Sequence, residues 1–124
     1  MTETKICPLA RAMDIIGDRW SLLIVRDLLR GKHRYNDFSN SAEKIPTNIL
    51  ASRLKRLQQQ GVVDKQPYQQ RPLRYEYHLT DKGLGLLPVI QQLALWSQQH
   101  HPECYHIPAE FFALSIADAA RQQG

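Results

Sequence analysis

The segment from Thr47 to Gln60 carries polar side chains whose types and spacing suit contact with a polyanion. At about 100° per residue, a helix here would bury Leu50, Leu54 and Leu57 on one face. The segment contains no Asp or Glu, although an exposed helix ordinarily mixes both signs of charge. The opposite face of the helix would hold only hydrogen-bonding and cationic groups: Asn48, Ser52, Lys55 and Gln59, flanked by Arg56.

Such a face suits a helix in the major groove of duplex DNA, where donors contact base edges and cations meet phosphates. The alternative is a solvated basic face with no partner. Ile45-Pro46-Thr47 predicts a turn into the helix, with Thr47 as its cap. Thr47 and Asn48 near the helix start would also be aided at a phosphate by the helix dipole.

A basic hairpin is predicted directly after this helix, which Gly61 ends. We expect strands at Val62–Gln66 and Arg74–Leu79, joined by an exposed loop that includes Pro67, Arg71 and Pro72. Arg71 and Arg74 would lie at the tip and shoulder of the hairpin, positioned for a phosphate backbone or minor groove.

The elements around this unit complete a mainly helical pattern. A short helix at about Asn36–Ser41 precedes the basic helix, with Phe38 inward, and Arg34 and Tyr35 at its start could anchor the other flank. Helix, turn, basic helix and basic hairpin together predict a winged helix-turn-helix of the α+β class, mainly α.

Further helices are predicted from apolar spacing on both sides of this unit. Pro8 begins one that runs to Ile16, and Asp18 caps the next, which Gly31 ends. Thr80-Asp81 starts a long helix to about His100, which Pro88 should bend. One more helix is expected between Pro108 and Gln123.

Composition bounds the class of protein. The 124 residues suit one folded domain, and 16 Lys and Arg against 12 Asp and Glu favour polyanionic partners. We expect neither a secretory signal nor a membrane span, and two cysteines are too few for a disulfide-built fold. We therefore expect a cytoplasmic protein without a cofactor.

Several short motifs occur in order at matching spacing, and their combination is more specific than any one of them. They are Cys7-Pro8, Gly17-Asp18-Arg19-Trp20, Arg34-Tyr35-Asn36-Asp37-Phe38, Ile45-Pro46-Thr47-Asn48-Ile49-Leu50, Arg53-Leu54-Lys55-Arg56-Leu57, Gly61-Val62-Val63, Glu76-Tyr77-His78-Leu79-Thr80, and Gly83 with Leu87-Pro88 and Trp96. With these motifs the chain resembles the HxlR-type transcription regulators of the MarR-like superfamily, over about Cys7 to His101.

The resemblance implies a bacterial, winged-helix homodimer that binds a palindromic operator and regulates transcription in response to chemical stress. Residues 1–101 would form the DNA-binding domain with its dimerisation helices, the long C-terminal helix and part of the first. Residues 102–124 would be a C-terminal extension, either loose or adding to the dimer contact. The candidate DNA contacts are Arg34, Tyr35, Thr47, Asn48, Ser52, Arg53, Lys55, Arg56, Gln59, Arg71 and Arg74.

Cys7 is the candidate redox sensor. It precedes Pro8 at a helix N-terminus, with Arg11 one turn on, and both the dipole and the cation favour the reactive thiolate. Redox-sensing members of the family that the chain resembles carry a cysteine at this place, modified by an oxidant or a small electrophile. The alternative is a buried, inert cysteine.

Other functions have less support in the sequence. Cys104 with His100, His101 and His106 could ligate a metal, but an exposed tail is the preferred interpretation, and His33 and His78 are expected to be surface or hairpin residues. No enzyme motif is recognisable, so catalysis is not expected. Two alternatives remain: a winged-helix protein-interaction module, and a regulator switched by a small-molecule ligand rather than by a thiol.

Overall fold

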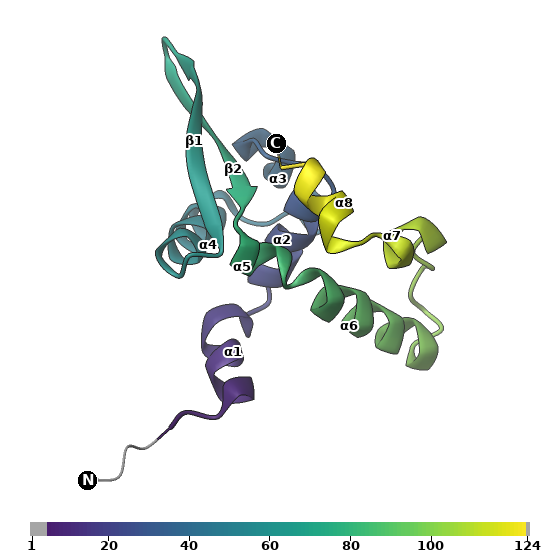
Figure 1. The fold of residues 1–124 in the computed structure, drawn as a ribbon. Helices are drawn as coiled ribbons and strands as arrows, with labels where there is room; N and C mark the ends of the chain where they lie inside the picture. The colour runs from purple at the N-terminus through teal and green to yellow at the C-terminus, as the bar shows by residue number, and fades with distance from the viewer. Residues whose placement is uncertain (1–4, 124) are drawn as a thin grey trace, which may run out of the picture.

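The apolar faces predicted from the sequence pack together in the computed structural model, which describes residues 5–123. The fold is mainly helical with one two-stranded antiparallel sheet, as predicted (Figure 1). The elements are α1 (Pro8–Ile16), α2 (Ser21–Leu29), α3 (Tyr35–Ser39), α4 (Thr47–Gln59), β1 (Val63–Gln70), β2 (Leu73–Leu79), α5 (Asp81–Leu84), α6 (Leu87–His100), α7 (Ala109–Ala113) and α8 (Ile116–Arg121).

Helix α2 lies at the centre of the core, which explains why it is apolar over most of its circumference. Leu28 and Leu29 are fully buried, and Phe38 of α3 is buried with them, as predicted. Helix α4 joins this core through Leu50, Leu54 and Leu57. Helix α1 projects from the body on the side opposite the hairpin (Figure 1).

The entry to α4 differs from the prediction. Pro46 is the N-cap residue, its carbonyl accepting the Leu50 N–H at 2.9 Å, and Thr47 is the first helical residue. The prediction of Thr47 as cap was therefore wrong. Pro46 has a non-helical ψ of 142°, so the helix can begin only after it. At the other end Gly61 has φ +74°, the left-handed conformation that glycine adopts at little cost.

The hairpin is longer and its loop shorter than predicted. The strands pair from Val63 opposite Leu79 to Gln70 opposite Leu73, which leaves only Arg71 and Pro72 in the turn. Pro67, expected in the loop, pairs with Tyr75 inside the sheet and is followed by a register shift. Both strands are edge strands, where a proline is tolerated. The two-residue turn carries Arg71 to the far end of a long arm (Figure 1).

The predicted long C-terminal helix is present but interrupted. Helix α5 ends at Leu84, and α6 begins at Leu87, with two residues between them. Pro88 lies in the first turn of α6, where no backbone N–H is needed, so it begins a helix rather than bending one. Among residues 5–123, no helix is both long and apolar enough to cross a lipid bilayer.

The residues after Pro102 fold back onto the body as two short helices rather than one. Ser115 caps α8 by accepting the Asp118 N–H at 3.0 Å, which separates α8 from α7. Ala119 of α8 is fully buried against the core. The side chain of Gln123 donates to the Leu28 carbonyl and accepts the Leu79 N–H, at 2.9 and 2.8 Å.

A stacked histidine pair lies beside this contact. The rings of His33 and His78 are 4.4 Å apart, and the carbonyl of Gln122 lies 2.8 Å from His33 Nε2. Both histidines are partly buried, and His78 belongs to strand β2 of the hairpin. Two residues 45 positions apart in the sequence are brought together here because β2 passes beside the start of α3.

Candidate nucleic-acid interface

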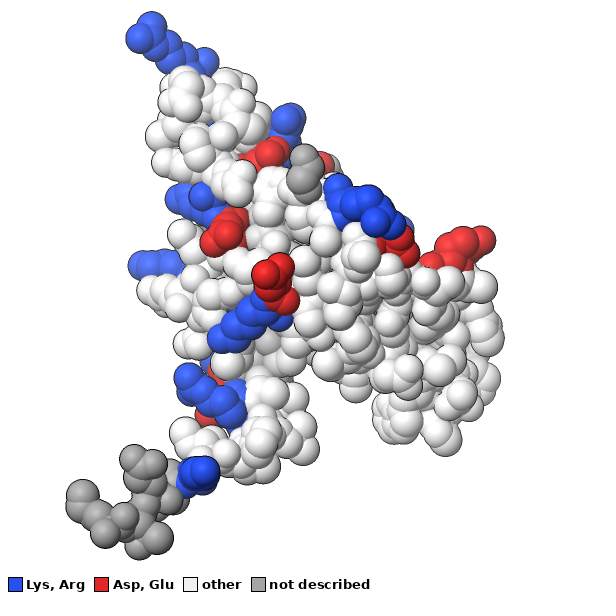
Figure 2. Space-filling model, in the orientation of Figure 1, with Lys and Arg blue, Asp and Glu red and all other residues white. Residues whose placement is uncertain are grey.

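The outer face of α4 is open, as the sequence predicts. Leu50, Leu54 and Leu57 are at most 1% exposed, because they pack into the core. The opposite side chains all lie in the exposed class: Asn48, Ser52, Lys55 and Gln59. Figure 2 shows Lys and Arg atoms along one edge of the molecule, from the hairpin tip past α4 to α1, with few acidic atoms among them.

A tyrosine hydrogen bond fixes the start of α4 against α3. The hydroxyl of Tyr35 donates to the Thr47 carbonyl at 2.9 Å, which ties the first residue of α3 to the first residue of α4. Thr47 itself is exposed. Tyr35 therefore positions α4, a role that sequence spacing does not signal.

Arg34 connects α3 to the hairpin. Its guanidinium carbon lies 3.8 Å from the centre of the Tyr68 ring, and Nε lies 3.7 Å from a Glu76 oxygen. The side chain is still 56% exposed, so part of the guanidinium faces solvent. It borders a groove of about 450 Å³ between α3 and the hairpin, whose other walls include Tyr35 and Arg74.

Arg53 and Arg56 are each engaged by backbone or acidic groups near α1. Arg53 Nε donates to Asp18 Oδ1 at 3.1 Å, and its side chain is partly buried. Arg56 donates to the carbonyl of Asp14, near the end of α1. These contacts hold α4 against the α1–α2 segment, whereas Lys55 is exposed between them on the outer face.

Arg71 and Arg74 are both exposed on the distal half of the hairpin. The structure thus brings the two arginines of the hairpin, the outer face of α4 and Arg34 onto one side of the molecule. The geometry suits a long polyanion better than a small substrate, because the cationic groups are spread over α3, α4 and the hairpin.

Comparison with known proteins gives the family. The model of the HxlR-like helix-turn-helix family matches residues 15–105. The chain belongs to this family. It is a transcription regulator of the HxlR type, and the members to which it is similar are regulators rather than enzymes.

Three similar proteins illustrate the match. The HTH-type transcriptional regulator YvaP of Bacillus subtilis (strain 168) is 35% identical over 100 residues, covering 80% of this chain and 93% of YvaP. The crystal structure of PA1607 superposes with a TM-score of 0.73 at 40% identity, covering 82% of this chain and 71% of PA1607. The redox regulator HypR in its oxidised form gives 0.70 at 30% identity, covering 77% of this chain and 98% of HypR.

Cys7 lies before residue 15, where the match to the HxlR-like family model begins. Cys7 is the exposed N-cap residue of α1. No backbone N–H of α1 completes a cap hydrogen bond to the sulfur, but those of Ala10 and Leu9 lie close enough to lower the pKa of the thiol. The thiol is thus not buried in the core of its own chain, as one alternative from the sequence had it.

Two exposed apolar stripes lie on α1 and α6. On α1 and the residue before Cys7 they are Ile6, Leu9 and Met13, and on α6 they are Val89, Leu93 and Trp96. Trp96 is 58% exposed, so it is not a core residue of this chain.

Among residues 5–123, no three His, Cys, Asp or Glu side chains gather as a metal site, and the cluster around Cys104 lies on the exposed segment after α6.

Proposed function

We propose that this HxlR-type regulator binds duplex DNA with α4 in the major groove and the hairpin on the adjacent backbone or minor groove. The observation that carries the proposal is the division of α4 into a buried leucine face and an exposed face without carboxylates. Asn48 and Ser52 would contact base edges, while Lys55, Arg71 and Arg74 would meet phosphates. Arg53 and Arg56 would act mainly through the placement of α4.

The proposed operator geometry requires two copies of the chain. A homodimer would present two α4 helices to half-sites about 34 Å apart, one helical turn of DNA. The unpartnered apolar stripes of α1 and α6 support this arrangement, since solvent-exposed side chains such as Leu9 and Trp96 are more stable when covered. A palindromic operator follows from the two-fold symmetry of such a dimer.

The experiment is a titration of the full chain with duplex DNA flanking its own gene, at salt concentrations rising from low to moderate. We expect affinity to fall roughly a thousandfold or more between about 50 and 200 mM salt, because several phosphate contacts release counterions. Lys55→Glu should abolish binding, and Arg121→Glu, on the distant α8, serves as the charge-matched control. Failure to retard any duplex at low salt would favour a protein-interaction module instead.

A second proposal concerns the signal: Cys7 senses oxidants or small electrophiles. It is supported by the exposure of the thiol, by its lowered pKa and by the similarity to the redox regulator HypR. The thiolate is the nucleophile, so a lowered pKa raises the reactive fraction near neutral pH. Oxidation of two such thiols to a disulfide would transfer two electrons to the oxidant and release two protons.

The second cysteine supplies a matched control for this proposal. Cys104 is also free and exposed, but it lies after α6, 3.9 Å from the Ser97 hydroxyl. We expect diamide to release DNA from the wild type and from Cys104→Ser, and to leave Cys7→Ser bound. Equal release from both variants would remove Cys7 from the mechanism while leaving the DNA-binding proposal intact.

A further inference from the structure

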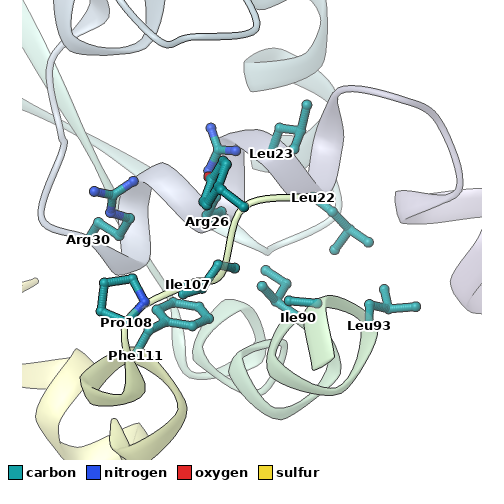
Figure 3. Close-up of a pocket in the computed structure, with 11 residues that line it drawn as sticks. Leu22, Leu23, Arg26, Arg30, Ile90, Leu93, Ile107, Pro108 and Phe111 are labelled. Carbon is teal, nitrogen blue, oxygen red and sulfur yellow. The ribbon is translucent and has the colours of Figure 1, made fainter. Parts of the chain in front are cut away.

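An apolar pocket lies between α2, α6 and the returning tail (Figure 3), and its lining includes no residue of α4 or the hairpin. Leu22 and Leu23 of α2 form one wall, and Ile90 and Leu93 of α6 form another. The volume is about 470 Å³, within the range of roughly 300–1,000 Å³ that is typical of small-molecule sites.

The third wall comes from residues that the family match does not cover. Ile107, Pro108 and Phe111 face α2 and α6 across the pocket (Figure 3), whereas the match ends at residue 105. The tail is held there by specific hydrogen bonds from α6. Gln91 donates to the carbonyls of Phe111 and Leu114, both at 2.9 Å, and Gln98 accepts the Ile107 N–H at 2.6 Å. The pocket is therefore formed before any ligand arrives.

The charged side chains that line the pocket are all basic. Two arginines one turn apart on α2, Arg26 and Arg30, border the pocket, and none of its lining residues is an acid. Arg26 is already neutralised, because Glu43 accepts two hydrogen bonds from it at 2.7 and 3.0 Å. Arg30 is exposed and forms no salt bridge with any residue in the range 5–123. One guanidinium is thus left to meet an anion at the border of an apolar space.

We propose that this pocket binds an amphipathic organic acid: a carboxylate attached to an aromatic or similarly apolar group of about two fused rings. The apolar part would lie among Leu23, Ile90 and Phe111, and the carboxylate would accept hydrogen bonds from Arg30. A guanidinium can bind a carboxylate through two parallel N–H donors, which distinguishes an acid from a neutral molecule of the same shape.

The test uses 2-naphthoate and its neutral analogue 2-naphthalenemethanol, each titrated calorimetrically into the full chain without DNA. We expect both to bind, with the acid about tenfold tighter. Arg30→Gln should reduce the affinity for naphthoate about tenfold and leave that for the alcohol unchanged. Arg121→Gln, which removes an exposed arginine from α8, should change neither affinity.

A second variant tests the location. Ala94 of α6 lines the pocket, so Ala94→Phe should fill it and weaken both probes, with thermal unfolding confirming that the variant is folded. The proposal is overturned if neither probe binds the wild type, or if acid and alcohol bind equally. Because no DNA is present, this outcome is independent of whether the chain binds an operator.

Discussion

Arg53 of α4 is ion-paired with Asp18, 35 residues earlier in the chain, with Nε and Oδ1 3.1 Å apart. The same carboxylate accepts the backbone N–H groups of Trp20 and Ser21 at 2.9 and 3.0 Å, just before α2. One acid therefore stabilises the start of the central helix and holds the proposed recognition helix beside it.

The protonation state of Asp18 should affect the free energy of unfolding. Partial burial opposes ionisation, but hydrogen bonds from Ser21, from the Trp20 backbone and from Arg53 outweigh it and lower the pKa of Asp18 to about 2. Because this value lies below the ordinary 3.8, the ionised carboxylate stabilises the fold above about pH 4, and the stabilisation is lost as the pH falls toward 2.

We therefore expect Asp18→Asn to lower the free energy of unfolding by about 1 kcal/mol at pH 7, after allowance for solvent screening. The difference from wild type should shrink to roughly half near pH 3. Urea unfolding between pH 3 and 7 measures it, with Asp64→Asn, an exposed acid of β1, as control. A difference that is constant with pH would contradict this account of Asp18.

Arg71 at the turn of the hairpin should contribute affinity without sequence preference. Removing one phosphate contact reduces the slope of log K against log salt by about 0.9. Arg71→Ala should thus weaken binding to operator and to unrelated duplex DNA by the same factor, as measured by fluorescence anisotropy over a salt series. Arg121→Ala should leave the slope at its wild-type value, and an Arg71→Ala slope equal to wild type would remove the hairpin tip from the interface.

Asn48 on the outer face of α4 should instead contribute discrimination between sequences. An amide that contacts a base edge is worth about 1–3 kcal/mol against the wrong base. Asn48→Ala should lower affinity for the operator more than affinity for unrelated DNA. The ratio of operator affinity to affinity for unrelated DNA should therefore fall. The matched control is Gln58→Ala, on the flank of the same helix. Equal losses on both DNAs would indicate that Asn48 only meets phosphate.

Periodicity alone was enough to predict which side of α4 is buried. Leu50, Leu54 and Leu57 recur at helical spacing, and burial of one face exposes the other whatever the tertiary details. The order of helices and hairpin followed from the same reasoning. The side-chain partners could not be predicted in this way, because Arg53 meets Asp18 and Tyr35 meets Thr47 only after the chain has folded.

Element ends were missed where tertiary packing outweighs local signals. The sequence predicts Pro67 in a loop, yet it is accommodated in a two-stranded sheet in which both strands are edges. His33 and His78 carry no local pattern that indicates a stacked pair. The segment 102–124 is predicted to be loose or to add to a dimer contact, whereas Ala119, on the predicted apolar side of this segment, is buried in the core of its own chain.

The tail should contribute measurably to stability through Gln123. Its amide bridges Leu28 and Leu79, and Gln123→Ala would leave both partly buried backbone groups without that partner. The expected cost is about 1–2 kcal/mol in the free energy of unfolding by urea. Gln122→Ala is the matched control, because Gln122 reaches His33 only through its backbone carbonyl. A cost equal to that of the control would show that the Gln123 amide does not stabilise the fold.

The proposed dimer makes a last prediction, on the apolar stripes of α1 and α6. Leu9 is 68% exposed and Trp96 58% exposed, and neither supports the core of its own chain. A glutamate at either position would bury a charge in the proposed interface, so Leu9→Glu and Trp96→Glu should each yield monomers in sedimentation equilibrium.

The same variants should separate assembly from folding and link it to DNA binding. Leu73→Glu places the same charge on an exposed leucine of the hairpin and should leave the dimer intact. The two monomeric variants should keep the wild-type circular dichroism spectrum, yet bind a palindromic duplex far more weakly, because each would engage only one half-site. A wild-type chain that sediments as a monomer would refute the dimer, and DNA binding would then have to proceed through single half-sites.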